Sequence, residues 1–166
     1  IEPRKNVSSI LEAYRHLPER VRAEYALVIA GPQGWKEGEL EKVMRRESWV
    51  HLVGYVDATD KPAICAGASL FVYPSFYEGF GFPVLEAMAL GVPTVTSNRS
   101  SLPEVTNGGA YLIDPYNTAE LTEAICELVQ DETLAQFFRE KGREAVRRYS
   151  WQETARQFLS AVSRLD

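Results

Sequence analysis

The sequence predicts an α/β fold: a Rossmann-like, three-layer domain in which helices cover both faces of a parallel sheet. Short, mostly apolar runs alternate with stretches of helical periodicity. Strands buried on both faces in parallel sheets have this pattern, and the alternation is typical of βαβ units. With 166 residues, the chain is the size of one domain. We therefore expect a single domain over residues 1–166.

The expected strands are short apolar runs that end at turn residues. Four of them are predicted to be fully buried, and the last one is shorter. They are Tyr25–Ala30, Trp49–Val53, Leu70–Tyr73, Pro93–Thr96 and Ala110–Ile113.

The expected helices are identified by their periodicity and their end signals. Asn6 is a candidate N-cap for a helix that continues to about Leu17, and Gly91 is expected just after the end of another helix. After the last strand the chain is predicted to form three helices, two of which begin with capping-box pairs. The helices between strands are Glu37–Arg46, Lys61–Ala66 and Pro83–Leu90, and the capping pairs are Asn117 with Glu120 and Ser150 with Glu153.

Composition excludes several classes of protein. The net charge is −5, so there is no broad basic field to attract nucleic acid or anionic lipid. The apolar runs are too short to cross a bilayer and no signal peptide opens the sequence, which favours the cytoplasm. Cys65 and Cys126 lack metal-ligand spacing, and we expect both to be buried thiols.

One segment carries most of the chemistry, and it follows the strand that ends at Tyr73. Gly79 and Gly81 allow the backbone to approach a ligand closely there, and Pro83 suits the first turn of the next helix. Ligands bind at the carboxyl ends of strands in open α/β sheets, and helix N-termini attract anions. A diphosphate is therefore the expected ligand.

Two carboxylates, Glu78 and Glu86, bracket this glycine loop with seven residues between them. Carboxylates would repel a diphosphate but accept hydrogen bonds from sugar hydroxyls. The alternatives are two surface acids, or a dinucleotide fingerprint built on Gly79 and Gly81. Val84 argues against the fingerprint, because that position requires a small residue.

The same segment resembles the family 4 retaining glycosyltransferases of GT-B fold, whose motif is two glutamates separated by seven residues. Here Glu78 and Glu86 match it. The resemblance covers nearly the whole chain, and four further segments carry it: Glu2–Asn6, His51–Val56, Ser101–Val105 and Tyr149–Trp151.

The resemblance implies a nucleoside-diphosphate sugar as donor and assigns roles to matching residues. Glu86 would hold the ribose, Glu78 the transferred sugar, and Lys5 the diphosphate. Val56 would border the nucleobase, together with Tyr55. The donor-binding loop would consist of Gly79, Phe80, Gly81 and Phe82, with backbone N–H groups facing sugar and phosphates. No metal or other cofactor is expected.

The stretch Ser100–Glu104 is similar to mannosyltransferases, which favours GDP-mannose over UDP-sugars as the donor. Within this stretch, Glu104 has two interpretations, an acid near the donor or a helix cap. The second diphosphate cation of the family, its first strand and its acceptor-binding domain are expected before Ile1. A saccharide or lipid-linked acceptor would bind that domain, which could bring the enzyme to a membrane surface.

Without those parts, we expect a gap in the sheet and no sugar transfer by these residues alone. Two other functions remain open. One is a nucleotide-sugar-binding or regulatory module without turnover, and the other is a sugar-nucleotide epimerase of the same fold.

Other conspicuous side chains have structural interpretations. His51 is expected to be a strand residue rather than a catalytic base. The tryptophans are predicted packing anchors and three tail arginines are predicted to be solvated. These residues are Trp35, Trp49 and Trp151, and Arg143, Arg147 and Arg148.

Overall fold

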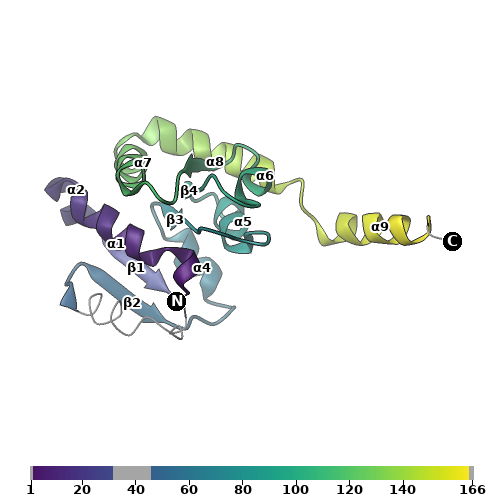
Figure 1. Ribbon diagram of the computed structural model, residues 1–166, viewed down its shortest axis with the longest axis horizontal. Coiled ribbons are helices and arrows are strands. Elements are labelled where there is room, and N and C mark those ends of the chain that lie inside the picture. Colours follow the sequence, from purple (N-terminus) through teal and green to yellow (C-terminus); the bar gives the residue numbers. More distant parts are fainter. Residues whose placement is uncertain (1, 32–45, 165–166) are drawn as a thin grey trace.

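The computed structural model describes residues 2–31 and 46–164 (Figure 1). The helix expected over 37–46 lies outside these residues except for its last position, and Trp35 lies outside them too. The strands are β1 (Leu27–Ala30), β2 (Val50–Gly54), β3 (Phe71–Tyr73), β4 (Thr94–Ser97) and β5 (Tyr111–Ile113). The helices are η1 (Pro3–Lys5), α1 (Val7–His16), α2 (Glu19–Glu24), α4 (Lys61–Ala66), α5 (Phe82–Ala89), α6 (Leu102–Thr106), α7 (Thr118–Gln130), α8 (Glu132–Val146) and α9 (Trp151–Val162).

All strand pairs are parallel, as the sequence predicts, but they form two sheets rather than one. Strands β1 and β2 make one sheet, and β3, β4 and β5 make the other in that order. In the described part of the chain no ladder joins β1 to β3. This break agrees with the expected gap in the sheet.

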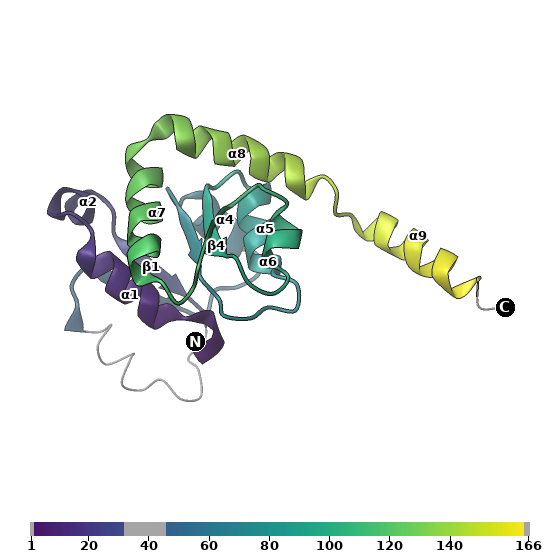
Figure 2. The same cartoon turned by 45° about the horizontal axis from the view of Figure 1, so that its top comes forward.

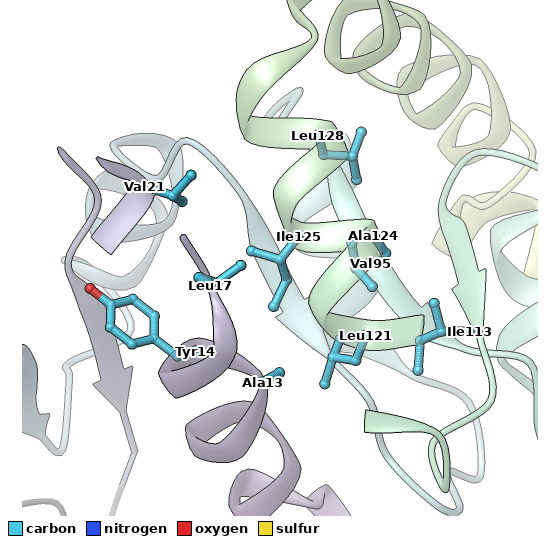
Figure 3. Close-up of a cluster of buried hydrophobic side chains, with 10 residues drawn as sticks. All are labelled: Ala13, Tyr14, Leu17, Val21, Val95, Ile113, Leu121, Ala124, Ile125 and Leu128. Atoms are coloured by element: carbon cyan, nitrogen blue, oxygen red, sulfur yellow. The ribbon is translucent and has the colours of Figure 1, made fainter. Parts of the chain in front are cut away.

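The larger sheet is covered on both faces, which confirms the three-layer arrangement. On one face, Val95 of β4 and Ile113 of β5 pack with side chains of α1 and α7 (Figure 3). On the other face, Phe71 and Tyr73 of β3 pack against buried residues of α5, α6 and α8. Successive β3 residues point to opposite faces, since Val72 joins the first cluster.

Helix α1 contacts both sheets and so bridges the break between them. Its residues Val7 and Leu11 pack on Val50 of β2, while Ala13 and Tyr14 belong to the cluster shared with α7. Figure 1 shows α1 lying between the β1–β2 sheet and α7. Packing of one helix on two sheets holds the smaller sheet to the body of the molecule.

The prediction of fully buried strands is right for β4, but it is wrong for the smaller sheet and for β3, whose residues are only partly buried. Every residue of β4 is buried. In β1 and β2, Val28 is 51% exposed and Val53 is 45% exposed. The reason is the coverage of that sheet: within the described residues, α1 packs on the face that presents Leu27 and Ile29.

The three-helix tail is confirmed, together with both capping boxes at their N-caps. Asn117 Oδ1 accepts from the Glu120 N–H at 3.2 Å, and Ser150 Oγ accepts from the Glu153 N–H at 3.1 Å. Helices α7 and α8 pack on the body, but α9 projects away from it in both views (Figures 1 and 2).

The projection of α9 makes one packing prediction wrong. Trp151 is 76% exposed although its ring stacks on that of Phe82, and no residue of its helix is buried. Trp49, in contrast, is a packing anchor as expected: its ring stacks on Tyr14 with 4.6 Å between centroids. His51 is an exposed residue of β2, and the three tail arginines are exposed.

Both cysteines are free and only partly buried, so the prediction of buried thiols is not met. Cys126 of α7 packs at the edge of the first core cluster, and Cys65 is a partly buried residue of α4. No helix among the described residues is long and apolar enough to span a membrane.

Candidate functional site

The glycine loop begins at the carboxyl end of β3 and ends at the start of α5. Pro74 and Ser75 are buried directly after the strand, and Glu78 is buried as well. Gly81 is the N-cap of α5 with φ of +106°, a backbone conformation that favours glycine. A Cβ there would also lie 2.7 Å from Leu102 Cδ2, so both backbone and packing require glycine.

The turn into α5 offers backbone donors to a ligand. Within the described residues, the N–H groups of Phe80, Gly81 and Phe82 make no hydrogen bond. Meanwhile the Ser101 hydroxyl donates to the Glu78 and Phe80 carbonyl oxygens at 2.9 and 3.0 Å, which fixes the loop from behind. Free N–H groups at a helix N-terminus are suited to an anion such as a phosphate.

The Glu78 carboxylate is surrounded by donors although it is only 8% exposed. Its Oε1 accepts from the Tyr73 hydroxyl at 2.7 Å and from the Ser75 hydroxyl at 2.9 Å. Its Oε2 lies 2.6 Å from Arg4 Nη1. Burial alone would make this charge costly, so these donors are what allow a carboxylate here.

The charges of this cluster shift one another's ionisation. Burial raises the pKa of Glu78, but the hydrogen bonds from Tyr73, Arg4 and Ser75 outweigh it and hold that pKa below its usual value. Burial, and then the hydrogen bond to Glu78, raises the pKa of Tyr73. The hydrogen bond to Glu78 is also the largest cause of a raised pKa for Arg4. Glu78 is therefore an ionised acceptor near neutral pH.

The turn η1 brings Lys5 and Arg4 to this cluster from the other end of the chain. Lys5 Nζ lies 5.4 Å from the centre of the Tyr73 ring, within range of a cation–π contact. The Arg4 carbonyl oxygen accepts from the Phe76 N–H at 2.8 Å. Both cations are thus fixed beside the carboxyl end of β3.

Asn6 follows η1 and anchors it. It occupies the N-cap position of α1, as predicted, but its side chain does not cap the helix. Instead, its buried amide donates to the carbonyl oxygens of Pro74 and Pro115 at 3.2 and 2.8 Å. Because these carbonyls follow β3 and β5, Asn6 ties the N-terminal turn to the exits of two strands.

Glu86 lies in the second turn of α5 and is exposed. It forms an ion pair with Lys61, the first residue of α4. Cys65 is one turn further along α4; burial, and then the charge of Glu86, raises the pKa of its thiol. Both partners of the pair are about half exposed, so it is a weak contact that a ligand can displace.

Tyr55 and Val56 follow the carboxyl end of β2 and lead towards α4. Tyr55 is 72% exposed, and Val56 is partly buried. The structure therefore brings Glu78, Lys5 and the glycine loop together at β3, while Tyr55 and Val56 lie at the end of a strand in the other sheet.

Sequence reasoning gave several residues of this site no part in ligand binding. Arg4, Tyr73 and Ser75 contact Glu78 directly, and Asn6 and Lys61 hold neighbouring groups. Tyr73 and Ser75 are five and three residues before Glu78, so their nearness was the available signal. Nothing local in the sequence indicates the contact of Arg4 with Glu78.

Other parts of the described surface offer weaker candidates. Open hollows on α7 and α8 are lined by Cys126, Glu127, Gln130, Asp131 and Leu134, and by Glu132, Thr133, Gln136, Phe137 and Glu140. None of these residues belongs to the glycine loop. Among the described residues no three His, Cys, Asp or Glu side chains gather as a metal site would require.

The chain is similar in sequence to two curated mannosyltransferases. The chain is 39% identical over 168 residues to O-antigen chain mannosyltransferase B of Escherichia coli, covering 99% of this chain and 44% of that protein. It is 32% identical to the serotype-specific mannosyltransferase WbdA of the same species, covering 99% of this chain and 21% of that one. The chain thus spans less than half the length of these relatives.

Similarity of structure extends over nearly all of the chain. Anabaena HepE, solved in complex with UDP and glucose, superimposes with a TM-score of 0.86 at 22% identity, over 98% of this chain and 46% of that one. Residues 1–145 match the family described as glycosyl transferases group 1. The chain therefore belongs to the glycosyl transferases group 1 family and has the α/β architecture of a GT-B glycosyltransferase domain.

Proposed function

We propose that this chain binds a nucleoside-diphosphate sugar, GDP-mannose, as the donor for retaining transfer of the sugar to a saccharide or lipid-linked acceptor. Glu86 holds the ribose and Glu78 holds the transferred sugar. The diphosphate lies between them, at the N–H groups of Phe80, Gly81 and Phe82. Val56 and Tyr55 border the base.

The observation that carries this proposal is the charge pattern around the loop. An ionised, buried carboxylate stands on one side of a cluster of free backbone donors, and a second carboxylate stands one helix turn beyond them. A diphosphate needs the donors, and the hydroxyl groups of a sugar and a ribose need the carboxylates. One ligand with a sugar, a diphosphate and a ribose in sequence satisfies all three.

The chemistry assigned to these groups is stabilisation of the leaving diphosphate. As the bond between the anomeric carbon and the phosphate oxygen breaks, negative charge grows on that oxygen. Lys5 and the N-terminus of α5 oppose this charge. Glu78 orients the sugar as it gains oxocarbenium character. No metal ion or cofactor is assigned a part, and the acceptor is assigned to the remainder of the enzyme.

Mannose is favoured by the sequence relatives. Both curated relatives named above are mannosyltransferases, and the similarity to each covers 99% of this chain. HepE, with UDP and glucose bound, resembles the chain in fold. It supports a nucleoside diphosphate as a ligand of a protein with this architecture, without deciding the base.

Calorimetric titration of the chain with GDP-mannose, GDP, UDP-glucose and UDP tests the proposal. We expect GDP-mannose and GDP to bind, and GDP-mannose to bind more tightly than UDP-glucose. A mannosyl transfer assay belongs beside it, with and without an added acceptor domain, and we expect turnover only with that domain. If none of the four nucleotides binds, the proposed donor site is wrong.

A further inference from the structure

Arg4 contacts the proposed sugar-binding carboxylate, yet the proposed function gives it no role. Its Nη1 lies 2.6 Å from Glu78 Oε2 and donates to the Tyr77 carbonyl oxygen at 3.3 Å. Its Nε donates to Glu2 Oε2 at 2.7 Å. The guanidinium therefore contacts both the exposed Glu2 and the buried Glu78.

The donors around Glu78 leave little capacity for a ligand. Each carboxylate oxygen accepts about two hydrogen bonds. The hydroxyls of Tyr73 and Ser75 fill Oε1, while Arg4 takes one position on Oε2. A sugar hydroxyl would thus meet Oε2, beside the guanidinium.

Arg4 is itself held in place before any ligand arrives. The Phe76 N–H donates to its carbonyl oxygen, and Glu2 engages its Nε. Asn6, two residues on, is fixed to the exits of β3 and β5. The planar fork of an arginine can contact two acids at once, which a lysine ammonium cannot do with the same geometry.

We propose that Arg4 is a positioning residue for the donor sugar: it fixes the Glu78 carboxylate so that Oε2 receives a single sugar hydroxyl, and it does not contact the diphosphate. The inference rests on the proposed function, because it deepens the role given to Glu78. It predicts that Arg4 matters for the sugar-bearing nucleotide and not for the nucleoside diphosphate alone.

The opposing possibility is that Arg4 turns away from Glu78 and binds the diphosphate, next to Lys5. The two roles differ in a measurable way. If Arg4 contacts the diphosphate, its substitution weakens the binding of GDP and of GDP-mannose alike. A positioning residue changes the difference between the two nucleotides.

The test is calorimetric titration with GDP and with GDP-mannose on four proteins: wild type, Arg4→Gln, Arg4→Lys and Arg15→Gln. Arg15 is a matched control, a half-exposed arginine of α1 that pairs with Glu12 and Glu47 away from the loop. We expect Arg4→Gln to weaken the affinity for GDP-mannose by about tenfold or more, as for a lost charged hydrogen bond. The affinity for GDP should fall by less than about twofold. Arg4→Lys should be intermediate, and Arg15→Gln should match wild type.

A second measurement tests the contact between Arg4 and Glu78 directly. Glu78 contacts Arg4 from η1 and the Tyr73 hydroxyl from β3. Glu2 pairs with Arg4, and Lys5 lies over the Tyr73 ring. Carbon-detected NMR titration of the Glu78 carboxyl should show a higher pKa in Arg4→Gln than in wild type. Thermal melting of each variant verifies that it is folded.

The outcomes separate the inference from the proposed function. If wild type binds neither nucleotide, the proposed function fails and the inference fails with it. If wild type binds both and Arg4→Gln weakens both equally, Arg4 is a diphosphate ligand and only the inference is overturned. An unchanged preference for GDP-mannose, or an unchanged Glu78 pKa in Arg4→Gln, also overturns it.

Discussion

Asn6 determines where the two cations of η1 stand, although it contacts no proposed ligand group. It is 3% exposed and has a φ of 55°, a conformation that asparagine tolerates better than most residues. Both of its amide hydrogens donate to carbonyl oxygens, one after β3 and one after β5. The position of Arg4 and Lys5 therefore depends on a side chain whose two N–H donors both bind backbone carbonyl groups.

We predict that Asn6→Asp destabilises the fold. The substitution keeps the size of the side chain but replaces the donating NH₂ with an oxygen that faces two carbonyl oxygens in a buried place. The free energy of unfolding should fall by about 2 kcal/mol or more. Urea denaturation measures it.

The matched control is Asn107→Asp, at an exposed asparagine that also has a left-handed conformation. We expect it to change the free energy of unfolding by less than about 0.5 kcal/mol. If Asn6→Asp were as mild as the control, the amide would not be what fixes η1.

At the scale of elements, the glycine loop and α5 act as one unit. The backbone turns at Gly81, and the helix that follows buries Val84 and Met88 against α6 and α8. Because α6 contributes Leu102 beneath the loop, the free N–H groups of the turn are held by packing from below.

We predict that Gly81→Ala disturbs this unit. An alanine would have to hold a positive φ, and its Cβ would lie 2.7 Å from Leu102 Cδ2. Strain and overlap together should cost about 1 to 3 kcal/mol of the free energy of unfolding. Thermal or urea denaturation reveals the loss.

Gly79→Ala is the comparison for that experiment. A Cβ at Gly79 meets nothing within 4 Å, and its φ is outside the positive region. Its free energy of unfolding should stay within about 0.5 kcal/mol of wild type. If both variants lost similar amounts of the free energy of unfolding, the turn would not depend specifically on a glycine at position 81.

Most elements were predictable from the sequence because their signals are local, whereas η1 and α2 were not expected. The Asn117 and Ser150 caps, the turn glycine at Gly91, and every strand in the described residues depend on neighbours within a few positions. Side-chain partners distant in sequence gave no such signal. Arg4 meets Glu78 only because η1 folds onto the end of β3, and periodicity carries no information about that.

Burial was predicted poorly where it depends on what covers an element. An apolar run predicts a strand, but not how much of that strand another layer hides. Val28 is half exposed for that reason. Likewise Trp151 begins an amphipathic helix in which no residue is buried; its ring stacks on that of Phe82 but stays mostly exposed, so its aromatic character alone gave the wrong environment.

At the scale of the whole molecule, α1 holds two parallel sheets together and η1 attaches to the larger one. The proposed ligand groups lie at the carboxyl ends of strands from both sheets: Glu78 after β3, and Val56 after β2. A donor bound as proposed would contact both. We therefore predict that binding of the nucleotide end of the donor depends on Glu86, and binding of its sugar end on Glu78.

Calorimetric titration of Glu86→Ala and Glu78→Ala with GDP and GDP-mannose tests this claim most directly. Glu123→Ala serves as the control, since Glu123 is exposed on α7. Glu86→Ala should weaken GDP by about 1.5 to 3 kcal/mol, or roughly 10- to 150-fold, as for a lost charged hydrogen bond. Glu78→Ala should leave GDP nearly unchanged and weaken GDP-mannose. Equal effects of the two substitutions on GDP, or no effect of either on GDP-mannose, would contradict the account.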